Sequence, residues 1–233
     1  MTKIKICGLR RPEDIAYVNE AQPDYCGFVI DVPFSSRSIS PEELSRLRES
    51  LDDSIHPVGV FVNAPPELVA GLLKEGVIRT AQLHGQEDER YLAAVRALCG
   101  SHRILPEMPE TAPCICASPP GPAPVPELWK SFSILGEKDL MRAQESSADM
   151  VLLDHGRGGT GRSFDWNLLD DLPPDTFSRP YILAGGLSPA NIPEVIRRYR
   201  PWAIDLSSSV ETDGHKDLSK IKAAMAAVRS VEL

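Results

Sequence analysis

Residues 151–166 read VLLDHGRGGTGRSFDW, and this stretch gives the clearest indication of how the chain folds. It opens with an apolar run of the length of a buried strand, and that run ends on the carboxylate of Asp154. Gly158, Gly159 and Gly161 follow, and glycines let backbone N–H groups come close to an anion. A carboxylate at the tip of a strand above such a loop predicts acid–base chemistry beside a phosphate group. Taken alone, Asp154 also fits the cap of a helix, and only the rest of the chain distinguishes between the two interpretations.

On both sides of this stretch, strand-like and helix-like segments alternate. Strands are expected at 3–7, 25–30, 57–62, 80–83, 150–153, 181–184 and 203–206, with room for an eighth between 99 and 149. Helices are expected at 12–20, 41–51, 65–75, 87–98, 137–146, 165–171, 188–198 and 218–228. This alternation is typical of parallel βαβ units. Eight units in one domain, residues 1–233, predict a single α/β barrel of the (β/α)8 or TIM type. An open doubly wound sheet is the alternative, although no G-x-G-x-x-G follows the first strand.

Residues 106–126 break the alternation, because they hold eight of the chain's 21 prolines and almost no charge. Proline disrupts helices and cannot donate to a strand ladder. We therefore expect a Pro-rich insertion before strand five of the barrel and place that strand at 128–134. The alternative places it at 103–105, which would make the prolines part of a long loop.

Composition narrows the class of function. The net charge is −8 and no block of Lys or Arg offsets it, which argues against a nucleic-acid partner. No window is long and apolar enough to span a membrane, and the first residues lack the apolar core of a secretion signal. The five cysteines are odd in number and lack the spacing of a disulfide framework or a zinc site. We expect a cytoplasmic protein without a metal.

Polar groups stand where the expected strands end. They are Cys7 with Gly8, Arg37, Asn63, Gln82 with His84, Asp154, Gly185 with Gly186, and Asp205 followed by Ser207, Ser208 and Ser209. In a (β/α)8 barrel the carboxyl ends of all strands surround one mouth, where the active site lies. The barrel therefore predicts that these groups form one site.

These residues resemble the phosphoribosylanthranilate isomerases of tryptophan biosynthesis. The resemblance rests on the following motifs: KICG at 5–8, SRSIS at 36–40, VGVFVN at 58–63, QLHG at 82–85, LLD at 152–154, GGTG at 158–161, FDW at 164–166, AGGL at 184–187 and DLSS at 205–208. It covers nearly the whole chain apart from roughly residues 101–127. The motifs at 5–8 and 152–166 are together highly specific.

The resemblance implies a (β/α)8 barrel that is an aldose–ketose isomerase, an intramolecular oxidoreductase. Such an enzyme converts N-(5-phosphoribosyl)anthranilate to 1-(2-carboxyphenylamino)-1-deoxyribulose 5-phosphate by an Amadori rearrangement. It implies no cofactor, a small phosphosugar–anthranilate molecule as the partner, and a monomer or a homodimer.

Within the resemblance, Cys7 corresponds to the general base and Asp154 to the general acid. The acid protonates the furanose ring oxygen, the ring opens to a Schiff-base cation, and the base removes the proton from C2′. Asp154 must then hold a proton near neutral pH, whereas Cys7 must be available as a thiolate. Ionising a free thiol at pH 7 costs roughly 2 kcal/mol.

The remaining site residues follow from the same resemblance. Arg37 is expected to bind the anthranilate carboxylate, which suits a planar guanidinium, and to face the phosphate loops across the mouth. Gln82 and Asp205 are expected substrate contacts, and His84 is expected to be structural. The expected phosphate-binding residues are Gly185, Gly186, Ser207 and Ser208, joined by Gly158, Gly159 and Gly161.

The sequence departs from the family pattern at one position, and two alternative functions stay open. Position 209 is Ser where the family usually has Gly, which questions a positive φ or a close backbone approach there. A related phosphosugar isomerase barrel would have aspartate where this chain has Cys7. A barrel that only binds a phosphate or anthranilate ligand would not need both Cys7 and Asp154.

Overall fold

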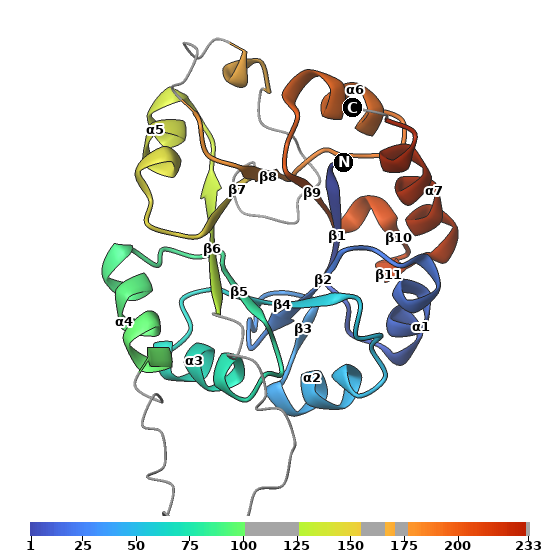
Figure 1. Ribbon diagram of the computed structural model, residues 1–233. Coiled ribbons are helices and arrows are strands. Elements are labelled where there is room, and N and C mark those ends of the chain that lie inside the picture. The colour runs from blue at the N-terminus through green and yellow to red at the C-terminus, as the bar shows by residue number, and fades with distance from the viewer. Residues whose placement is uncertain (101–125, 155–165, 171–176, 232–233) are drawn as a thin grey trace, which may run out of the picture.

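The computed structural model describes residues 1–100, 126–154, 166–170 and 177–231. In this part of the chain, parallel strands form one sheet. They are β1 (Lys3–Cys7), β2 (Tyr25–Ile30), β3 (Ser38–Ile39), β4 (His56–Phe61), β5 (Thr80–Leu83), β6 (Glu127–Ser133), β7 (Met150–Asp154), β8 (Tyr181–Leu183) and β9 (Ala203–Leu206). Strand β1 pairs with both β2 and β9, which closes the sheet into a barrel (Figure 1). The predicted (β/α)8 barrel is confirmed, and the open sheet is excluded.

Helices surround the barrel, as the view along its axis shows (Figure 1). They are α1 (Pro12–Ala21), α2 (Pro41–Arg48), α3 (Pro66–Lys74), α4 (Glu89–Gly100), α5 (Glu137–Glu145), α6 (Ile192–Tyr199) and α7 (Leu218–Arg229). Two short 3-10 helices, η1 (Trp166–Leu169) and η2 (Ser208–Val210), follow β7 and β9. None of the described helices is long and apolar enough to cross a membrane.

Local sequence signals explain several helix starts. At the start of α2, the Ser40 hydroxyl accepts a hydrogen bond from the Glu43 N–H, and the Glu43 carboxylate accepts one from the Ser40 N–H. This reciprocal capping box, with Pro41 in the first turn, explains why the helix starts at residue 41, where the sequence predicts its start. Helix α1 likewise begins at Pro12, as expected.

Three helix predictions were wrong in extent. The helix predicted at 41–51 ends at Arg48. The segment predicted as a helix at 188–198 begins its helix only at Ile192, because Asn191 Oδ1 accepts the Ser188 N–H at 2.8 Å and holds residues 188–191 in a turn. The helix predicted at 165–171 is, in its described part, the 3-10 helix η1. The sequence analysis also did not anticipate β3 or the hairpin of β10 (Glu211–Thr212) and β11 (His215–Lys216).

Strand β6 confirms the strand predicted at 128–134 to within one residue. It pairs with β5 on one side and β7 on the other, so it completes the barrel wall. The Pro-rich segment 106–126 and the alternative strand at 103–105 lie outside the described residues, apart from residue 126.

The core has two layers, as expected for a barrel wrapped in helices. A large cluster joins one face of the strands to the helices, with Ile6, Cys26 and Phe28 packed against residues such as Ile15 and Val18 of α1. A smaller cluster fills the barrel itself. Its buried members are Tyr25, Val58, Trp129, Met150, Leu152, Ile182, Ala184 and Ala203. Because each large apolar side chain stabilises the fold by about 1.5–3 kcal/mol when buried, both layers hold the strand ends in place.

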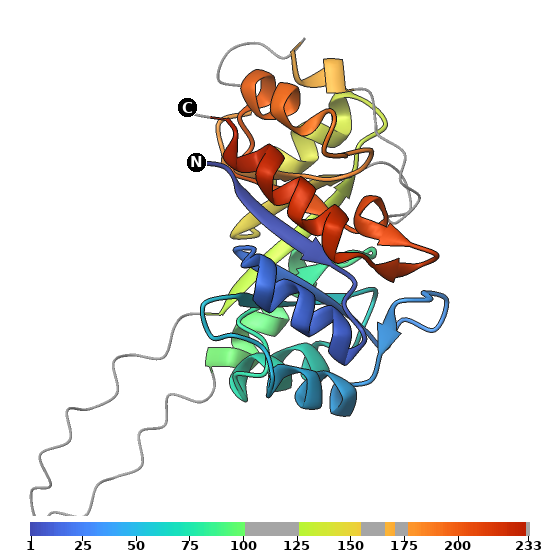
Figure 2. The same cartoon turned by 90° about the vertical axis from the view of Figure 1, so that its right-hand side faces the viewer.

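The strand ends that matter for function face one end of the barrel. Viewed from the side, β3 and the β10–β11 hairpin project from this same end (Figure 2). Both follow the carboxyl end of a barrel strand, β2 and β9 respectively. They therefore add walls to the mouth of the barrel.

Candidate active site

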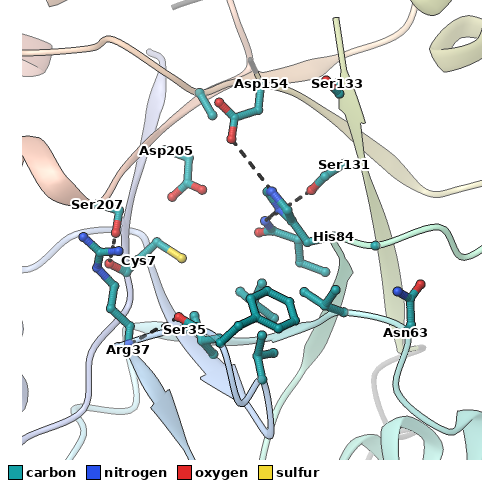
Figure 3. A pocket seen from close by; sticks show the side chains of 18 of the residues that line it. Cys7, Ser35, Arg37, Asn63, His84, Ser131, Ser133, Asp154, Asp205 and Ser207 are labelled. Atoms are coloured by element: carbon teal, nitrogen blue, oxygen red, sulfur yellow. Dashed lines mark hydrogen bonds and ion pairs between the residues drawn. The ribbon is translucent and has the colours of Figure 1, made fainter. Parts of the chain in front are cut away.

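A cavity of about 880 Å³ opens at the carboxyl ends of the strands. Its lining includes Cys7, Arg37, Gln82, His84, Asp154, Asp205 and Ser207. Figure 3 shows Cys7, His84, Asp154 and Asp205 directed into the same space. These side chains come from strands or loops that are distant in the sequence. The structure thus brings together the groups that the strand ends predict.

A second cavity, of about 280 Å³, shares Asp154, Asp205 and Ser207 with the first. Its other lining residues include Gly185, Gly186, Ser208 and Ser209, the residues of the expected phosphate loops. The remaining expected phosphate residues, Gly158, Gly159 and Gly161, lie outside the described residues.

The two glycines after β8 have a conformational reason to be glycine. Gly185 and Gly186 have φ values of 79° and 66°, in the left-handed region that other residues rarely adopt. Ser209 does not share this conformation, since it lies within the 3-10 helix η2 and is not among the described residues with positive φ. Serine at position 209 therefore causes no backbone strain.

Cys7 is the last residue of β1, and only 8% of it is exposed. Burial raises the pKa of its thiol above the ordinary value, and the neighbouring ammonium groups of Lys5 and Lys216 offset only part of this rise. The thiol is free, as are those of Cys26 and Cys99.

Asp154 ends β7 and is also 8% exposed. The Nε2 atom of His84 lies 3.8 Å from Asp154 Oδ2 (Figure 3). Burial lowers the pKa of His84 to about 4, so the imidazole is neutral at pH 7 and this contact is not an ion pair. His84, which the sequence analysis leaves as structural, thus lies beside the candidate acid in the cavity wall.

Gln82 connects His84 to the neighbouring strand. Its Nε2 atom is 3.1 Å from His84 Nδ1 and 3.3 Å from the hydroxyl of Ser131. Gln82 is 1% exposed, so its amide is part of the cavity wall rather than of the open mouth. A neutral His84 that accepts the amide N–H at Nδ1 carries its own proton on Nε2, toward Asp154.

Arg37 lies in the loop before β3 and forms a two-pronged ion pair with Glu211 of β10. Its Nε and Nη2 atoms donate to the two Glu211 oxygens at 2.8 and 2.7 Å. Lys216 Nζ donates to the same carboxylate at 2.6 Å and to the Ser207 carbonyl at 3.1 Å. These contacts tie the Arg37 loop to the segment after β9.

Gly8 makes this arrangement possible. Its φ is +84°, and a Cβ atom there would lie 2.5 Å from Arg37 Cδ and 3.3 Å from the Ser207 hydroxyl. The expectation that Arg37 faces both phosphate loops across the mouth was therefore wrong for the loop after β9. Its side chain passes beside Ser207, because the Glu211 carboxylate, which Lys216 also binds, draws the guanidinium to that side.

The sequence analysis missed Lys5 and Glu211. Lys5 had a local signal, since it stands two residues before Cys7 on a strand and so shares its face. Glu211 had none, because it is 174 residues from Arg37 in the sequence and only the closed barrel brings the two together.

Glu211 gives a prediction about acid stability. Burial raises its pKa, but hydrogen bonds from Arg37 and Lys216 outweigh burial and lower the pKa to about 2. An unfolded glutamate titrates near pH ~4.3, so the ion pairs contribute stability above that pH and lose it as the pH falls toward 2. We expect Glu211→Gln to lower the free energy of unfolding at pH 7, with the difference from the wild type shrinking between about pH 4 and pH 2.

Denaturant unfolding across this pH range measures the effect. The exposed Glu75→Gln is the control and should change little at any pH. A Glu211→Gln difference that stays constant down to pH 2 would show that the carboxylate charge is not what stabilises this corner.

Among the described residues, no three His, Cys, Asp or Glu side chains lie where they could hold a metal ion.

Comparison with known proteins agrees with the geometry. The sequence profile of the family described as N-(5'-phosphoribosyl)anthranilate (PRA) isomerase matches residues 4–110 and 124–227. A relative of that name from Endomicrobium trichonymphae is 37% identical over an alignment of 235 positions, which covers 99% of this chain and 100% of the relative.

Two solved structures are similar over almost the whole chain. The phosphoribosyl anthranilate isomerase of Thermus thermophilus has a TM-score of 0.77 and 32% identity, over 98% of this chain and 99% of its own. A phosphoribosyl anthranilate isomerase in complex with reduced 1-(o-carboxyphenylamino)-1-deoxyribulose 5-phosphate has a TM-score of 0.73 and 30% identity, over 99% of this chain and 100% of its own. With the barrel, the cavity and the family profile in agreement, the chain belongs to the N-(5'-phosphoribosyl)anthranilate isomerase family.

Proposed function

We propose that this protein isomerises N-(5-phosphoribosyl)anthranilate to 1-(2-carboxyphenylamino)-1-deoxyribulose 5-phosphate in tryptophan biosynthesis. The observation that carries the proposal is one cavity lined by both Cys7 and Asp154, in a chain of this family. This pair fits two alternatives less well. A related phosphosugar isomerase would have aspartate at the end of the first strand, and a barrel that only binds its ligand would not need both residues.

The reaction needs an acid first. Asp154 gives its proton to the furanose ring oxygen, the bond from that oxygen to C1′ breaks, and a Schiff-base cation forms. The position of Asp154 in the lining of the cavity supports this role. The imidazole of His84 lies on the same side of the cavity, with Nε2 at 3.8 Å from Asp154 Oδ2.

The base acts second. The Cys7 thiolate takes the proton from C2′, and the electron pair of that C–H bond moves to the cationic imine to give an enolamine. Tautomerisation of the enolamine to the ketone completes the rearrangement. No atom is gained or lost, so the residues need only to move protons and hold charge, a task for which general acid–base catalysis contributes typically 10²–10⁴-fold.

Substrate binding divides between the two cavities. Arg37 is proposed to bind the anthranilate carboxylate, with Gln82 and Asp205 in the wall around the substrate. The smaller cavity is proposed to take the phosphate on the backbone and hydroxyl groups of Gly185, Gly186, Ser207 and Ser208, joined by Gly158, Gly159 and Gly161. Its place after the last two barrel strands, next to a short helix, is typical of phosphate sites in such barrels.

Removal of the arginine side chain tests this division. A hydrogen bond to a charged group contributes about 1.5–3 kcal/mol. Arg37→Ala should therefore weaken binding of reduced 1-(o-carboxyphenylamino)-1-deoxyribulose 5-phosphate, an analogue of the product, by roughly 10- to 100-fold. Inorganic phosphate, measured as a competitive inhibitor, should weaken much less. Arg37 would belong to the phosphate site if both ligands lost affinity equally.

The direct test of the function is a turnover assay. The purified protein is mixed with freshly prepared N-(5-phosphoribosyl)anthranilate, and the loss of substrate fluorescence is followed. We expect the substrate fluorescence to fall at a rate that is proportional to the amount of protein added. A rate equal to that without protein would contradict the proposal.

Three broader points belong to the same proposal. Residues 1–233 are proposed to form one barrel domain with 106–126 inserted before β6, and residues 111–123 fall outside the family profile. The free thiols of Cys7, Cys26 and Cys99 support a reducing cytoplasm as the location. The protein is proposed to be a monomer or a homodimer that needs no cofactor.

A further inference from the structure

Lys5 is a fully buried cation inside the barrel. Its exposure is 0%, and it shares its strand face with Cys7 because side chains two residues apart on a strand point the same way. A buried ammonium group is costly unless it is paired. The pairing partner is Asp205, which stands opposite Lys5 in the register of β1 and β9 and accepts hydrogen bonds at 3.0 Å through both oxygens.

The second neighbour of this ammonium group is the Cys7 thiol. The two groups attract each other electrostatically, since Cys7 raises the pKa of Lys5 and Lys5 lowers the pKa of Cys7. Both atoms border the same small space above Gly27, where an added Cβ would lie 2.7 Å from Cys7 Sγ and 2.9 Å from Lys5 Nζ. Gly27 pairs with Cys7 in the register of β1 and β2, so the missing side chain leaves room for the two groups to meet.

We propose that Lys5 is a positioning residue that holds the Cys7 sulfur in place and stabilises its thiolate. The proposal deepens the proposed function and rests on the role of Cys7 as the base. Asp205 has a part in it as well. The carboxylate and the thiolate compete for one ammonium group, so Asp205 neutralises Lys5 while the thiol is protonated and shares it once the thiolate forms.

The charges around Cys7 support this balance. Burial would lower the pKa of Lys5, but Asp205 and Cys7 raise it above the ordinary value, so Lys5 stays a cation. Burial raises the pKa of Cys7, Lys5 lowers it, Asp205 raises it, and Lys216 lowers it. Arg37 from the β2–β3 loop and Cys26 from β2 also interact with the Cys7 charge, and Asp154 borders the same cavity. Among these groups, Lys5 opposes the effect of burial on the pKa of Cys7 most strongly.

The rate of Cys7 alkylation as a function of pH tests the proposal without any turnover. The whole protein is treated with iodoacetamide between pH 6 and pH 11, and the modified Cys7 peptide is quantified by mass spectrometry. The reagent can reach Cys7 through the 880 Å³ cavity. Cys26 faces the helix side, is 0% exposed and serves as an internal reference that should stay unmodified while the protein is folded.

Two variants should shift the midpoint of the alkylation profile in opposite directions, and a third should leave it unchanged. Lys5→Met should move the midpoint of the alkylation profile up by at least about one pH unit, which is about a tenfold slower reaction at a fixed pH below it. Asp205→Asn should move the midpoint down, because the competitor for the ammonium group is gone. Lys3→Met is the matched control, on the same strand face but at the far side of Lys5, where its ammonium lies 4.5 Å from the Trp202 ring centre. It should leave the midpoint unchanged.

Turnover gives the second readout. In Lys5→Met, kcat/KM at pH 7 should fall about tenfold or more and recover as the pH rises, since a base with a higher pKa needs a higher pH to lose its proton. A residue that only supports the fold would lower the rate at every pH alike.

Because Lys5→Met leaves a buried Asp205 without its cation, the double variant Lys5→Met/Asp205→Asn is made as well, so that the test does not depend on the folding of the single variant. Its midpoint should lie above that of Asp205→Asn by about the same one unit. The proposal would be overturned if Lys5→Met had the midpoint of the wild type and the double variant had the midpoint of Asp205→Asn. It would also be overturned if Lys3→Met shifted the midpoint as much as Lys5→Met does. An inactive wild-type protein with the predicted alkylation pattern would contradict the proposed function but not the role of Lys5.

Discussion

Replacement of Cys7 by serine should lower kcat by at least 10²-fold while the barrel stays folded. Serine keeps the shape and the polar character of the side chain, but its hydroxyl does not ionise in the range where a thiol does. The base that removes the C2′ proton would be lost, and a positioned proton-transfer group contributes typically 10²–10⁴-fold. Steady-state kinetics with circular dichroism and thermal melting measure both parts of the result.

The control for this variant is Cys26→Ser on the neighbouring strand. Cys26 stands opposite Ile6 in the register of β1 and β2, and it packs in the helix-side layer of the core rather than in the cavity. Its replacement should leave the kcat of the folded protein within a few-fold of the wild type. The assignment of Cys7 as the base fails if the two serine variants have similar kcat values.

Asp154→Asn should give a loss of similar size for a different reason. The amide occupies the same space at the end of β7, but it has no proton to give to the ring oxygen, so ring opening would be slow. Because β7 stays paired with β6 and β8 on both sides, we expect the melting temperature to change little. We expect a kcat reduced by at least 10²-fold from the loss of a positioned general acid.

Asp149→Asn is the matched control at the opposite end of the same strand. Asp149 accepts the Leu128 N–H at 2.8 Å and binds Arg96 at 3.0 Å, far along β7 from the cavity. Its loss should lower stability and leave the kcat of the folded fraction close to the wild type. Near-normal kcat in Asp154→Asn would assign the acid to another group.

Much of the barrel was predictable because its signals are local. Each strand is a short apolar run, and proline or a capping box marks the starts of α1 and α2. The carboxyl ends of such strands meet at one mouth whatever the loops do, so Cys7, Asp154 and Asp205 could be placed together before their distances were known.

The parts that were missed depend on contacts between distant segments. The pair of Arg37 with Glu211 joins residues 174 apart, and it places the guanidinium beside the loop after β9 rather than across the mouth from it. The late start of α6 depends on the Asn191 side chain, which satisfies the Ser188 N–H in a turn where Ser-Pro alone suggests a helix cap. The position of His84 beside Asp154 could not be predicted, because a lone histidine gives no sign of what faces it, and only the fold brings it to 3.8 Å from Asp154.

The most direct test of the central claim is an NMR identification of the product. Purified wild-type protein, Cys7→Ser and Asp154→Asn are each incubated with N-(5-phosphoribosyl)anthranilate, and the signals of the product are followed with time. We predict that the wild type forms the 1-amino-1-deoxyketose with its C2′ carbonyl, and that both variants form it at least 10²-fold more slowly. The account is contradicted if the wild type leaves the substrate to hydrolyse to anthranilate, or if either variant forms the ketose at the wild-type rate.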